Sequence, residues 1–408
     1  MTITFIHSAD LHLGRVFTGL RHLPGNIYEH VVESGFRALE KLIDAAIEHD
    51  VDFVLFVGDV FDSNDVSLRT ILRFRQQLER LKQHEIHVFI SYGNHDPFTE
   101  RRYVDWPENV TVFTDEEVTS KSFTTKTGQK VNIYGFSYMT KEIFTDKSEE
   151  YIKVGDAEFH IATLHGNVDG QTDHDSYAPF SVTNLKEKDF DYWALGHIHK
   201  RQILTEEPPI VYPGNIQGMH RKELGEKGCI LVTLTDGMKP AITFIPTADV
   251  IWREEVIDIT DVETFNHLLD KLSERKEDFR KQNTFVHLRF VGNGKLNDQL
   301  QIAYELDDLL WAVNDGEHER FPFVWIASAN VQTTGDWNRE ELRKREDFIG
   351  ELIASIDVYE DFDEAIKPLF KNRHVRSFIH AFSEEEKQAL LDRAERLLLT
   401  QFMKEYEK

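Results

Sequence analysis

Five short apolar runs, each closed by a cluster of Asp, His or Asn residues, dominate the first half of the sequence. Each run is rich in β-branched, aromatic and leucine residues, which is the composition of a buried β-strand. Where such strands alternate with helices, polar side chains gather at the edge where the strands end. The pattern therefore predicts an α/β domain with one polar site. The five runs are TITFIHSAD, DFVLFVGDV, HVFISYGN, FHIATLHG and DYWALGH.

Two amphipathic helical patterns separate the first three strands, at residues 28–50 and 66–84. After about Trp252 the pattern changes to short strands and helices, which is typical of a small α+β domain. After Gly335 it is helical throughout. We therefore predict a layered β-sheet core flanked by helices (residues 1–248), a smaller α+β capping domain (249–335) and a helical C-terminal tail (336–408).

The tail carries two apolar stripes at helical spacing. Ser383 and Glu386 stand at the spacing of a capping box, which predicts the start of the second helix. The stripes need a partner surface, and the periodicity gives equal weight to the chain's own domains and to another protein. The stripes are Leu342, Phe348, Ile349, Leu352, Ile353 and Ile356, and Leu390, Leu391, Ala394, Leu397, Leu398 and Phe402.

The charge of the chain argues against a nucleic-acid partner at first sight. Its 47 basic and 72 acidic residues give a net charge of −25, whereas phosphate binding usually shows as a basic surface. Affinity for a polyanion would have to come from metal ions, from local Arg and Lys residues, or from a partner subunit. The charge lowers the weight of a DNA hypothesis without excluding it.

The chain has 408 residues, 40% of them hydrophobic, which allows more than one core. No apolar stretch is long enough for a membrane helix, and the N-terminus carries no leader pattern. The single Cys229 cannot form an internal disulfide, which fits a reducing compartment. We therefore expect a cytoplasmic protein with no membrane association.

The polar clusters at the strand ends have the residue types of metal ligands. Imidazole, carboxylate and amide oxygen without thiolate suit manganese, with iron or zinc as alternatives. Two ions roughly 3.5–4 Å apart need a carboxylate between them, and Asp59 is the natural bridge. The clusters are Asp10 with His12, Gly58 with Asp59, Asn94 with His95 and Asp96, His165, and His197 with His199.

The order of these clusters resembles the calcineurin-like metallophosphoesterases. Within them the chain is similar to the SbcD-type DNA repair exonucleases, and in particular to the bacterial YhaO branch. Protein phosphatases of the superfamily carry GDxxDRG and GNHE, whereas this chain has Asp62-Ser63-Asn64 and GNHD. The motifs that carry the resemblance are ADLHLG (9–14), GDVFD (58–62), GNHD (93–96), LHG (164–166), GHIHK (196–200) and YPGNIQGMHRKELGEKG (212–228).

The resemblance implies a role for each matching residue. His95 would stabilise the phosphate or protonate the leaving oxygen, and Asp96 would orient its ring. Some relatives have a His at the position of Asp62 that aligns the DNA phosphate, a contact that Asp62 cannot donate. One ion would be held by Asp10, His12, Asp59 and His199, and the other by Asp59, Asn94, His165 and His197.

Four more histidines and one loop are left over from this assignment. His160 is interpreted as a packing residue of a strand, while His7, His174 and His220 are undecided candidates. The PGNIQG segment predicts either a turn that lines the site or a plain hairpin connection.

The leading hypothesis is a manganese-dependent DNA exonuclease with some endonuclease activity. By resemblance it would act in double-strand break repair with an SbcC-like coiled-coil ATPase, gripped by the C-terminal helices, and a homodimer through helices of the first domain is also implied. A second hypothesis is a phosphodiesterase or phosphatase on nucleotides or small phosphates, which suits the acidic composition. A third is an ATPase-binding scaffold with weak hydrolysis, against which the intact ligand set argues.

Overall fold

The computed structural model describes residues 1–15, 17–20, 22–63, 65–98, 104–169, 177–335, 339–359, 361–371 and 382–406. The chain divides into two compact units. The first consists of Met1–Arg253, Phe279–Phe285 and Gly316–Trp325, and the second of Glu254–Asp278, Val286–Asp315 and Ile326–Lys408. The three-part division at residues 248 and 335 stays a prediction.

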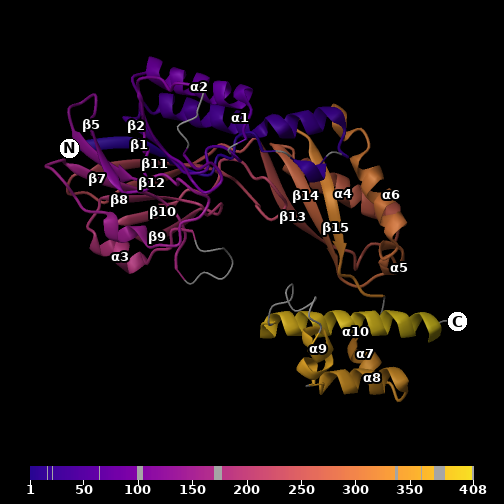
Figure 1. Ribbon diagram of the computed structural model, residues 1–408. Coiled ribbons are helices and arrows are strands. Elements are labelled where there is room, and N and C mark those ends of the chain that lie inside the picture. Colours follow the sequence, from indigo (N-terminus) through magenta and orange to yellow (C-terminus); the bar gives the residue numbers. More distant parts are fainter. Residues whose placement is uncertain are drawn as a thin grey trace. The chain divides into compact units, whose positions relative to one another are not determined.

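The first unit contains two six-stranded sheets (Figure 1). In the first sheet, β1, β2, β3 and β4 are parallel neighbours, and β11 and β12 extend it in antiparallel fashion beside β1. The strand order is β12-β11-β1-β2-β3-β4. The strands are β1 (Thr2–Ser8), β2 (Phe53–Val57), β3 (His87–Ser91), β4 (Val110–Val112), β11 (Gly228–Thr235) and β12 (Ala241–Pro246).

The second sheet has the order β5-β6-β7-β8-β10-β9. Its four inner strands run parallel, and the edge strands β5 and β9 are antiparallel to their neighbours. The strands are β5 (Thr119–Thr124), β6 (Lys130–Gly135), β7 (Phe159–His165), β8 (Tyr192–Gly196), β9 (Gln202–Glu206) and β10 (Pro209–Tyr212).

The alternation of side chains along β2 shows how the layers are held together. Phe53, Leu55 and Val57 belong to a core between the two sheets, whereas Val54 and Phe56 face the helices on the other side. The strand is therefore buried on both faces, which explains its unbroken apolar run. The helices that cover the first sheet are α1 (Gly25–Glu48) and α2 (Leu68–Gln83).

A third apolar cluster covers the far face of the second sheet and includes Trp193, Leu195 and Leu185. Leu185 comes from the short helix α3 (Val182–Glu187), whose backbone carbonyl at Leu185 accepts a hydrogen bond from Trp193 Nε1 at 3.1 Å. Within the part of the chain that the structure describes, the 3₁₀ turns are η1 (Thr18–Leu20), η2 (Lys147–Glu150) and η3 (Glu317–Glu319).

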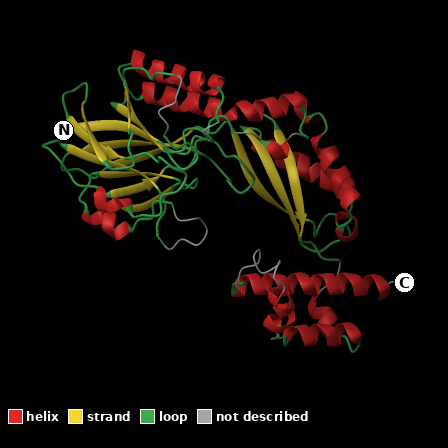
Figure 2. Cartoon of the chain, in the orientation of Figure 1, coloured by secondary structure: helices red, strands yellow, loops and turns green. Residues whose placement is uncertain are grey.

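A smaller three-stranded sheet has the order β13-β14-β15, and Figure 2 shows its strands beside helices. The segment 297–314 forms two helices, because the chain turns at Gln301 and Ile302. The elements are β13 (Val250–Asp258), α4 (Phe265–Phe279), β14 (Asn283–Val291), α5 (Asn297–Leu300), α6 (Ala303–Asn314) and β15 (Val324–Val331).

The described residues of the tail form four helices: α7 (Arg339–Arg343), α8 (Phe348–Asp357), α9 (Phe362–Lys371) and α10 (Glu384–Tyr406). The predicted capping box is confirmed, because the Ser383 N–H donates to Glu386 at 2.8 Å and the Glu386 N–H donates to Ser383 at 3.2 Å. The two stripes pack partly against each other: Ile349 and Ile353 are buried in one cluster with Leu399. On α10, Leu399 is buried although the predicted stripe omits it, and Phe402 of the predicted stripe packs against the same cluster.

The predicted fold class is confirmed: an α/β protein with layered sheets, flanking helices and a helical C-terminus. All five predicted strands are present. The strands that were not predicted include the edge strands β5, β9 and β12, in which intermediate and exposed positions prevail. Such strands lack the apolar run that marked the inner ones.

Candidate metal centre

The five predicted ligand clusters follow five parallel strands, three in the first sheet and two in the second. Asp10 and His12 follow β1, and Asp59 follows β2. The loops after these two strands are joined, because the His12 N–H donates to the Asp59 carbonyl at 2.9 Å and the Asp10 N–H to the Gly58 carbonyl at 3.2 Å. The site is thus built on the carboxyl ends of buried strands.

The backbone of these loops is held in an unusual conformation. Eight described non-glycine residues have a positive φ, and four of them are the predicted ligands Asp10, His12, Asp59 and His197. This left-handed region is sparsely populated by residues with a side chain and costs of order 1–3 kcal/mol each. Backbone strain is therefore concentrated where the candidate ligands lie, as is common at functional sites.

Three glycines allow the chain to close around His165 and Asp59. A β-carbon at Gly58 would lie 1.9 Å from Nδ1 of His165, and one at Gly93 would lie 2.2 Å from Oδ1 of Asp59. A β-carbon at Gly196 would meet Nδ1 of His165 at 2.7 Å. Any side chain at these positions would displace a candidate ligand, which explains the glycines of GDVFD, GNHD and GHIHK.

Two buried carboxylates lie at the centre. Both oxygens of Asp10 accept from the His197 N–H, at 3.0 and 3.1 Å. Asp59 accepts from the His95 N–H at 2.9 Å through Oδ1. Its Oδ2 lies 3.4 Å from Nε2 of His165 and 3.7 Å from Nε2 of His12. Asp59 thus stands between two groups of imidazoles, in the position expected of a bridge.

The charges of this cluster are strongly coupled. Burial raises the pKa of Asp10. Burial opposes the ionisation of Asp59 too, but His165 and His12 outweigh it and lower the pKa of Asp59. In turn Asp59 outweighs burial at His165 and raises the pKa of that imidazole to about 9. Protons on the histidines therefore offset the negative charge of the carboxylates. Metal ions that displace those protons offset the same charge.

His12 and His199 give a direct test of whether cations fit. Their Nε2 atoms lie 3.0 Å apart. Nδ1 of His12 faces Oδ1 of Asp62 at 3.2 Å, and Nδ1 of His199 lies 2.7 Å from Oε1 of Glu223. A carboxylate at each Nδ1 favours a proton there and a lone pair on each Nε2. Two lone pairs at this distance repel unless a proton or a metal ion lies between them, so the pair fits a metal ion that takes the place of a shared proton.

The remaining predicted ligands lie in the same cluster. Oδ1 of Asn94 is 3.0 Å from Nε2 of His165, and the rings of His165 and His197 have centroids 5.4 Å apart. Three groups of residues place one ligand atom each within 4.8 Å of one another. They are Asp10, His12 and His199; Asp10, Asp59 and His165; and His12, Asp62 and His95. The assignment of ligands to individual ions stays a prediction.

The two predicted catalytic residues have different surroundings. His95 is exposed, and its Nδ1 lies 3.2 Å from the carbonyl oxygen of Asp62. Asp96 is fully buried, and its carboxylate accepts from the N–H groups of Phe61 and Gly93 at 3.0 and 2.9 Å. Asp96 therefore ties the loop after β3 to the loop after β2, while its action on the His95 ring stays a prediction.

The four histidines left over from the assignment have separate outcomes. His7 is fully buried, contacts the Tyr192 hydroxyl at 2.9 Å and the Leu195 carbonyl at 3.0 Å, and has a pKa lowered to about 3 by burial. It is a core residue. His160 contacts the Tyr134 hydroxyl at 2.8 Å within the second sheet. Nε2 of His220 lies 3.3 Å from Oε1 of Glu223, and His174 lies outside the described residues.

Sequence reasoning missed Glu223, although it lies within the motif at residues 212–228. Burial opposes its ionisation, but the contact with His199 prevails and lowers the pKa of Glu223 to about 2. The PGNIQG segment also contributes: Asn215 is fully buried and donates to Glu223 at 2.9 Å. A single acidic residue among several charged neighbours carries no pattern that would reveal this role.

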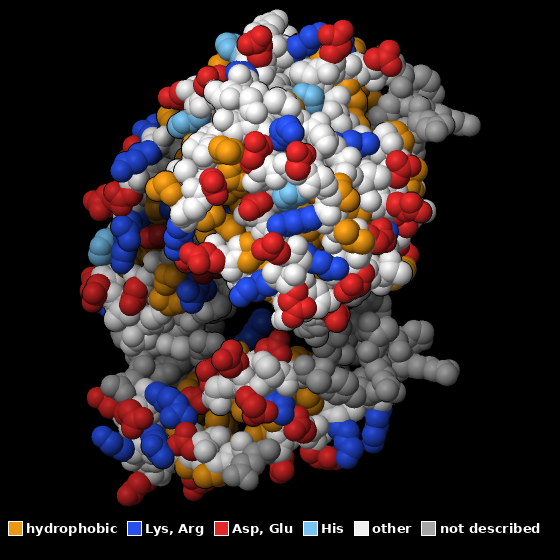
Figure 3. Space-filling model, turned by 90° about the vertical axis from the view of Figure 1, so that its left-hand side faces the viewer, with side chains coloured by type: hydrophobic (Ala, Val, Ile, Leu, Met, Phe, Trp, Pro, Cys, Tyr) orange, Lys and Arg blue, Asp and Glu red, His pale blue; other side chains and the backbone are white. Residues whose placement is uncertain are grey.

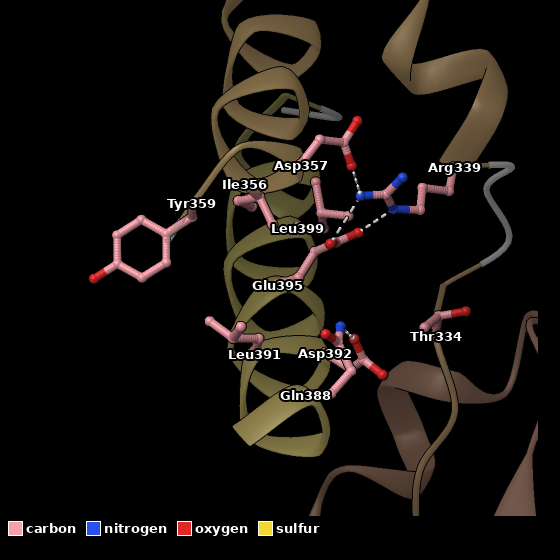
Figure 4. A pocket seen from close by; sticks show the side chains of 10 residues that line it. All are labelled: Thr334, Arg339, Ile356, Asp357, Tyr359, Gln388, Leu391, Asp392, Glu395 and Leu399. Carbon is pink, nitrogen blue, oxygen red and sulfur yellow. Dashed lines mark hydrogen bonds and ion pairs between the residues drawn. The ribbon is translucent and has the colours of Figure 1, made fainter. Parts of the chain in front are cut away.

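A hollow of about 520 Å³ lies in the tail, between α7, α8 and α10 (Figure 4). Arg339 donates to Asp357 at 2.7 Å and forms an ion pair with Glu395. These side chains point toward one another and join the tail helices, so we interpret the polar residues of the hollow as structural. Its ten lining residues include none of the predicted metal ligands.

Comparison with known proteins agrees with the site. The calcineurin-like phosphoesterase profile matches residues 3–201. The chain is 36% identical over 403 residues to YhaO of Bacillus subtilis (strain 168), an uncharacterized metallophosphoesterase, across 98% of each chain. It is 25% identical over 300 residues to the DNA double-strand break repair protein Mre11 of Sulfolobus acidocaldarius, across 70% of this chain and 74% of that one.

Among solved structures, a dimetal phosphatase from Danio rerio matches with a TM-score of 0.37 and 11% identity, over 59% of this chain and 98% of that chain.

The chain belongs to the calcineurin-like metallophosphoesterase family. It is accordingly a metal-dependent phosphoester hydrolase with a candidate dimetal site. In the part of the chain that the structure describes, no helix is both long and apolar enough to cross a membrane. The finer resemblance to SbcD-type exonucleases stays a prediction.

We expect Asp59→Ala to lose both metal ions, because its carboxylate lies between the two groups of imidazoles. Asp59→Asn, which keeps the shape of the side chain, should also bind less metal, and His12→Ala should lose mainly one ion. Metal content per chain after loading with manganese and desalting checks this. Asp156→Ala, at an exposed carboxylate, is the control and should keep both ions. An Asp59→Ala protein with two tightly bound ions would remove the bridge.

Proposed function

We propose that this metallophosphoesterase is a manganese-dependent DNA nuclease, an exonuclease with some endonuclease activity in the repair of double-strand breaks. The observation that carries the proposal is the gathering of the predicted ligands around buried Asp59, with the exposed imidazole of His95 beside them. Oxygen and imidazole ligands without thiolate favour manganese, and iron or zinc are the alternatives.

The comparison with Mre11 supports DNA as the substrate. That protein is named for DNA double-strand break repair, and its similarity covers 70% of this chain. The general phosphoesterase profile covers only residues 3–201. The likeness to a repair protein therefore includes residues outside the region that all members of the profile share.

His95 would supply the proton that the leaving oxygen needs. Because a carbonyl oxygen only accepts hydrogen bonds, its contact with Nδ1 assigns a proton to that nitrogen. Nε2 is then the nitrogen that faces the leaving group, and it hands over a proton from the imidazolium form, in which both ring nitrogens carry one; the ring is left neutral with its proton on Nδ1. A pair of divalent ions, when bound, would activate water and stabilise the negative charge on the phosphate.

Nucleotides or other small phosphate esters are the alternative substrates. The net charge of −25 favours them, because it repels a long polyanion. Figure 3 shows one face of the molecule, on which acidic and basic side chains of the described residues are interspersed without forming a basic field. A third reading, an ATPase-binding scaffold with weak hydrolysis, is less consistent with a complete ligand set.

The tail is proposed as the docking element for an SbcC-like coiled-coil ATPase. On α10, Leu397 is 65% exposed and Leu398 is 41% exposed, although Leu399 beside them is buried. Exposed apolar side chains on a helix are typical anchors for docking against another helix.

A homodimer would be supported by Leu68 and Leu72, which are exposed one turn apart on α2. The cytoplasmic location stays a prediction.

We expect the purified protein with manganese to cleave labelled double-stranded and single-stranded DNA faster than a small chromogenic phosphodiester at equal concentration of scissile bonds. Zinc and iron are tested in parallel. Turnover of the small ester alone, with intact DNA, would favour the small-substrate alternative and contradict the proposal.

In the same assay, His95→Ala should slow cleavage by roughly 10²–10⁴, the usual loss for a general acid, while metal content stays at the wild-type value. His95 contributes a side chain that is exposed, so its removal should leave the fold intact. If metal content and rate fall together, His95 is a ligand and its assignment as a proton donor is wrong.

For the tail, Leu397→Glu should weaken binding to an SbcC-like ATPase by about 2 kcal/mol or more if Leu397 is a central anchor, measured by calorimetry. Hydrolysis of a small ester should be unchanged. Gln388→Glu, at an exposed polar position on the opposite side of α10 with the same added charge, is the control. Equal binding by the two variants would show that this face of α10 does not dock the partner.

A further inference from the structure

His199 is held on two sides by the segment 212–228, which follows it in the chain. Its Nδ1 lies 2.7 Å from Oε1 of Glu223. Its carbonyl oxygen accepts from Nζ of Lys227 at 3.0 Å. A β-carbon at Gly214 would meet the same carbonyl oxygen at 2.8 Å, so the segment passes the His199 backbone closely. Both the ring and the main chain of His199 are therefore fixed by this segment.

Glu223 is fixed in turn by neutral donors. Its Oε2 accepts from the Met219 N–H at 2.7 Å and from Nδ2 of Asn215 at 2.9 Å. The side chain is 8% exposed, and Asn215 is fully buried. These donors occupy Oε2 and leave Oε1 directed at His199. This arrangement fixes the position of Oε1 and keeps the carboxylate from rotating toward solvent.

We propose that Glu223 is a positioning residue for His199, which holds a proton on Nδ1 and keeps the lone pair of Nε2 directed into the metal centre. A carboxylate at the far nitrogen of a metal-binding imidazole fixes its tautomer and orientation and raises its basicity. The inference rests on the metal-ligand role proposed for His199 and is independent of the substrate. It also explains the PGNIQG segment, because Asn215 of that segment supplies a donor that holds the positioning carboxylate.

The effect should be confined to one ion. His199 groups with Asp10 and His12, whereas His165 groups with Asp10 and Asp59. Nδ1 of His165 contacts the carbonyl oxygen of Val57 at 3.1 Å and does not depend on Glu223. The loss of Glu223 should therefore weaken the ion at the His199 end and spare the ion at the His165 end.

His220 provides a matched control, because its Nε2 also lies near Oε1 of Glu223, at 3.3 Å. The His220 side chain is half exposed, and it belongs to none of the three candidate metal groups. His220→Ala removes an imidazole neighbour of Glu223 without touching the contact between Glu223 and His199. If Glu223 acts through His199, this variant should bind metal as the wild type does.

The test is calorimetric titration of the metal-stripped full-length protein with Mn²⁺ alone. We expect Glu223→Gln, which keeps the shape and removes the charge, to weaken one binding event by 10–100-fold and to leave the other within about twofold. Glu223→Ala should have at least the same effect on that event. In addition, ¹⁵N spectra of histidine-labelled protein should show the Nδ1-protonated form of His199 in the wild type and a tautomer mixture in Glu223→Gln.

Three results would overturn the inference. Equal weakening of both events would indicate a general structural role, and unchanged binding in Glu223→Gln and Glu223→Ala would show that the carboxylate is idle. The same loss in His220→Ala would place the effect outside the contact with His199. Failure of the metal assignment itself would look different, because His199→Ala would then leave both binding events intact.

Discussion

The structure depends on the burial of two carboxylates, Asp10 and Asp59, at the ends of neighbouring parallel strands. A buried charge is unfavourable by several kcal/mol unless opposite charges and hydrogen-bond donors surround it. Here the surrounding groups are histidine rings and backbone N–H groups. The imidazoles share protons with the carboxylates, or they lose those protons and bind metal cations. The cluster therefore suits ions of high positive charge.

The rest of the first unit can be understood as support for this cluster. Apolar cores on both faces of each sheet hold the strand ends in place, and that packing carries the backbone strain of Asp10, His12 and Asp59. Glycines allow the loops to close on the ligands, and carboxylates behind the rings, Asp62 and Glu223, set which nitrogen faces inward. Rigid elements that carry the ligands, with further residues that orient them, are what a preorganised metal site requires.

Much of this could be predicted from the sequence because the inner strands are buried on both faces. Unbroken apolar runs such as β2 marked the strands, and the polar residues after them marked the site. The edge strands escaped prediction because their half-exposed positions carry no apolar run. Glu223 escaped because it lies 24 positions after His199, and the chain between them holds two strands and a turn. On α10 the predicted stripe rightly included Phe402 but held Leu398 in place of the buried Leu399, because helical spacing alone does not distinguish these two neighbours.

The central claim is that Asp59 bridges two metal ions, and anomalous diffraction from crystals of the manganese-loaded protein tests it most directly. We expect two anomalous peaks per chain, roughly 3.5–4 Å apart, on either side of the Asp59 carboxylate. One peak should lie beside His12 and His199, and the other beside Asn94 and His165. A single peak, or a pair of peaks that the Asp59 carboxylate does not join, would contradict the claim.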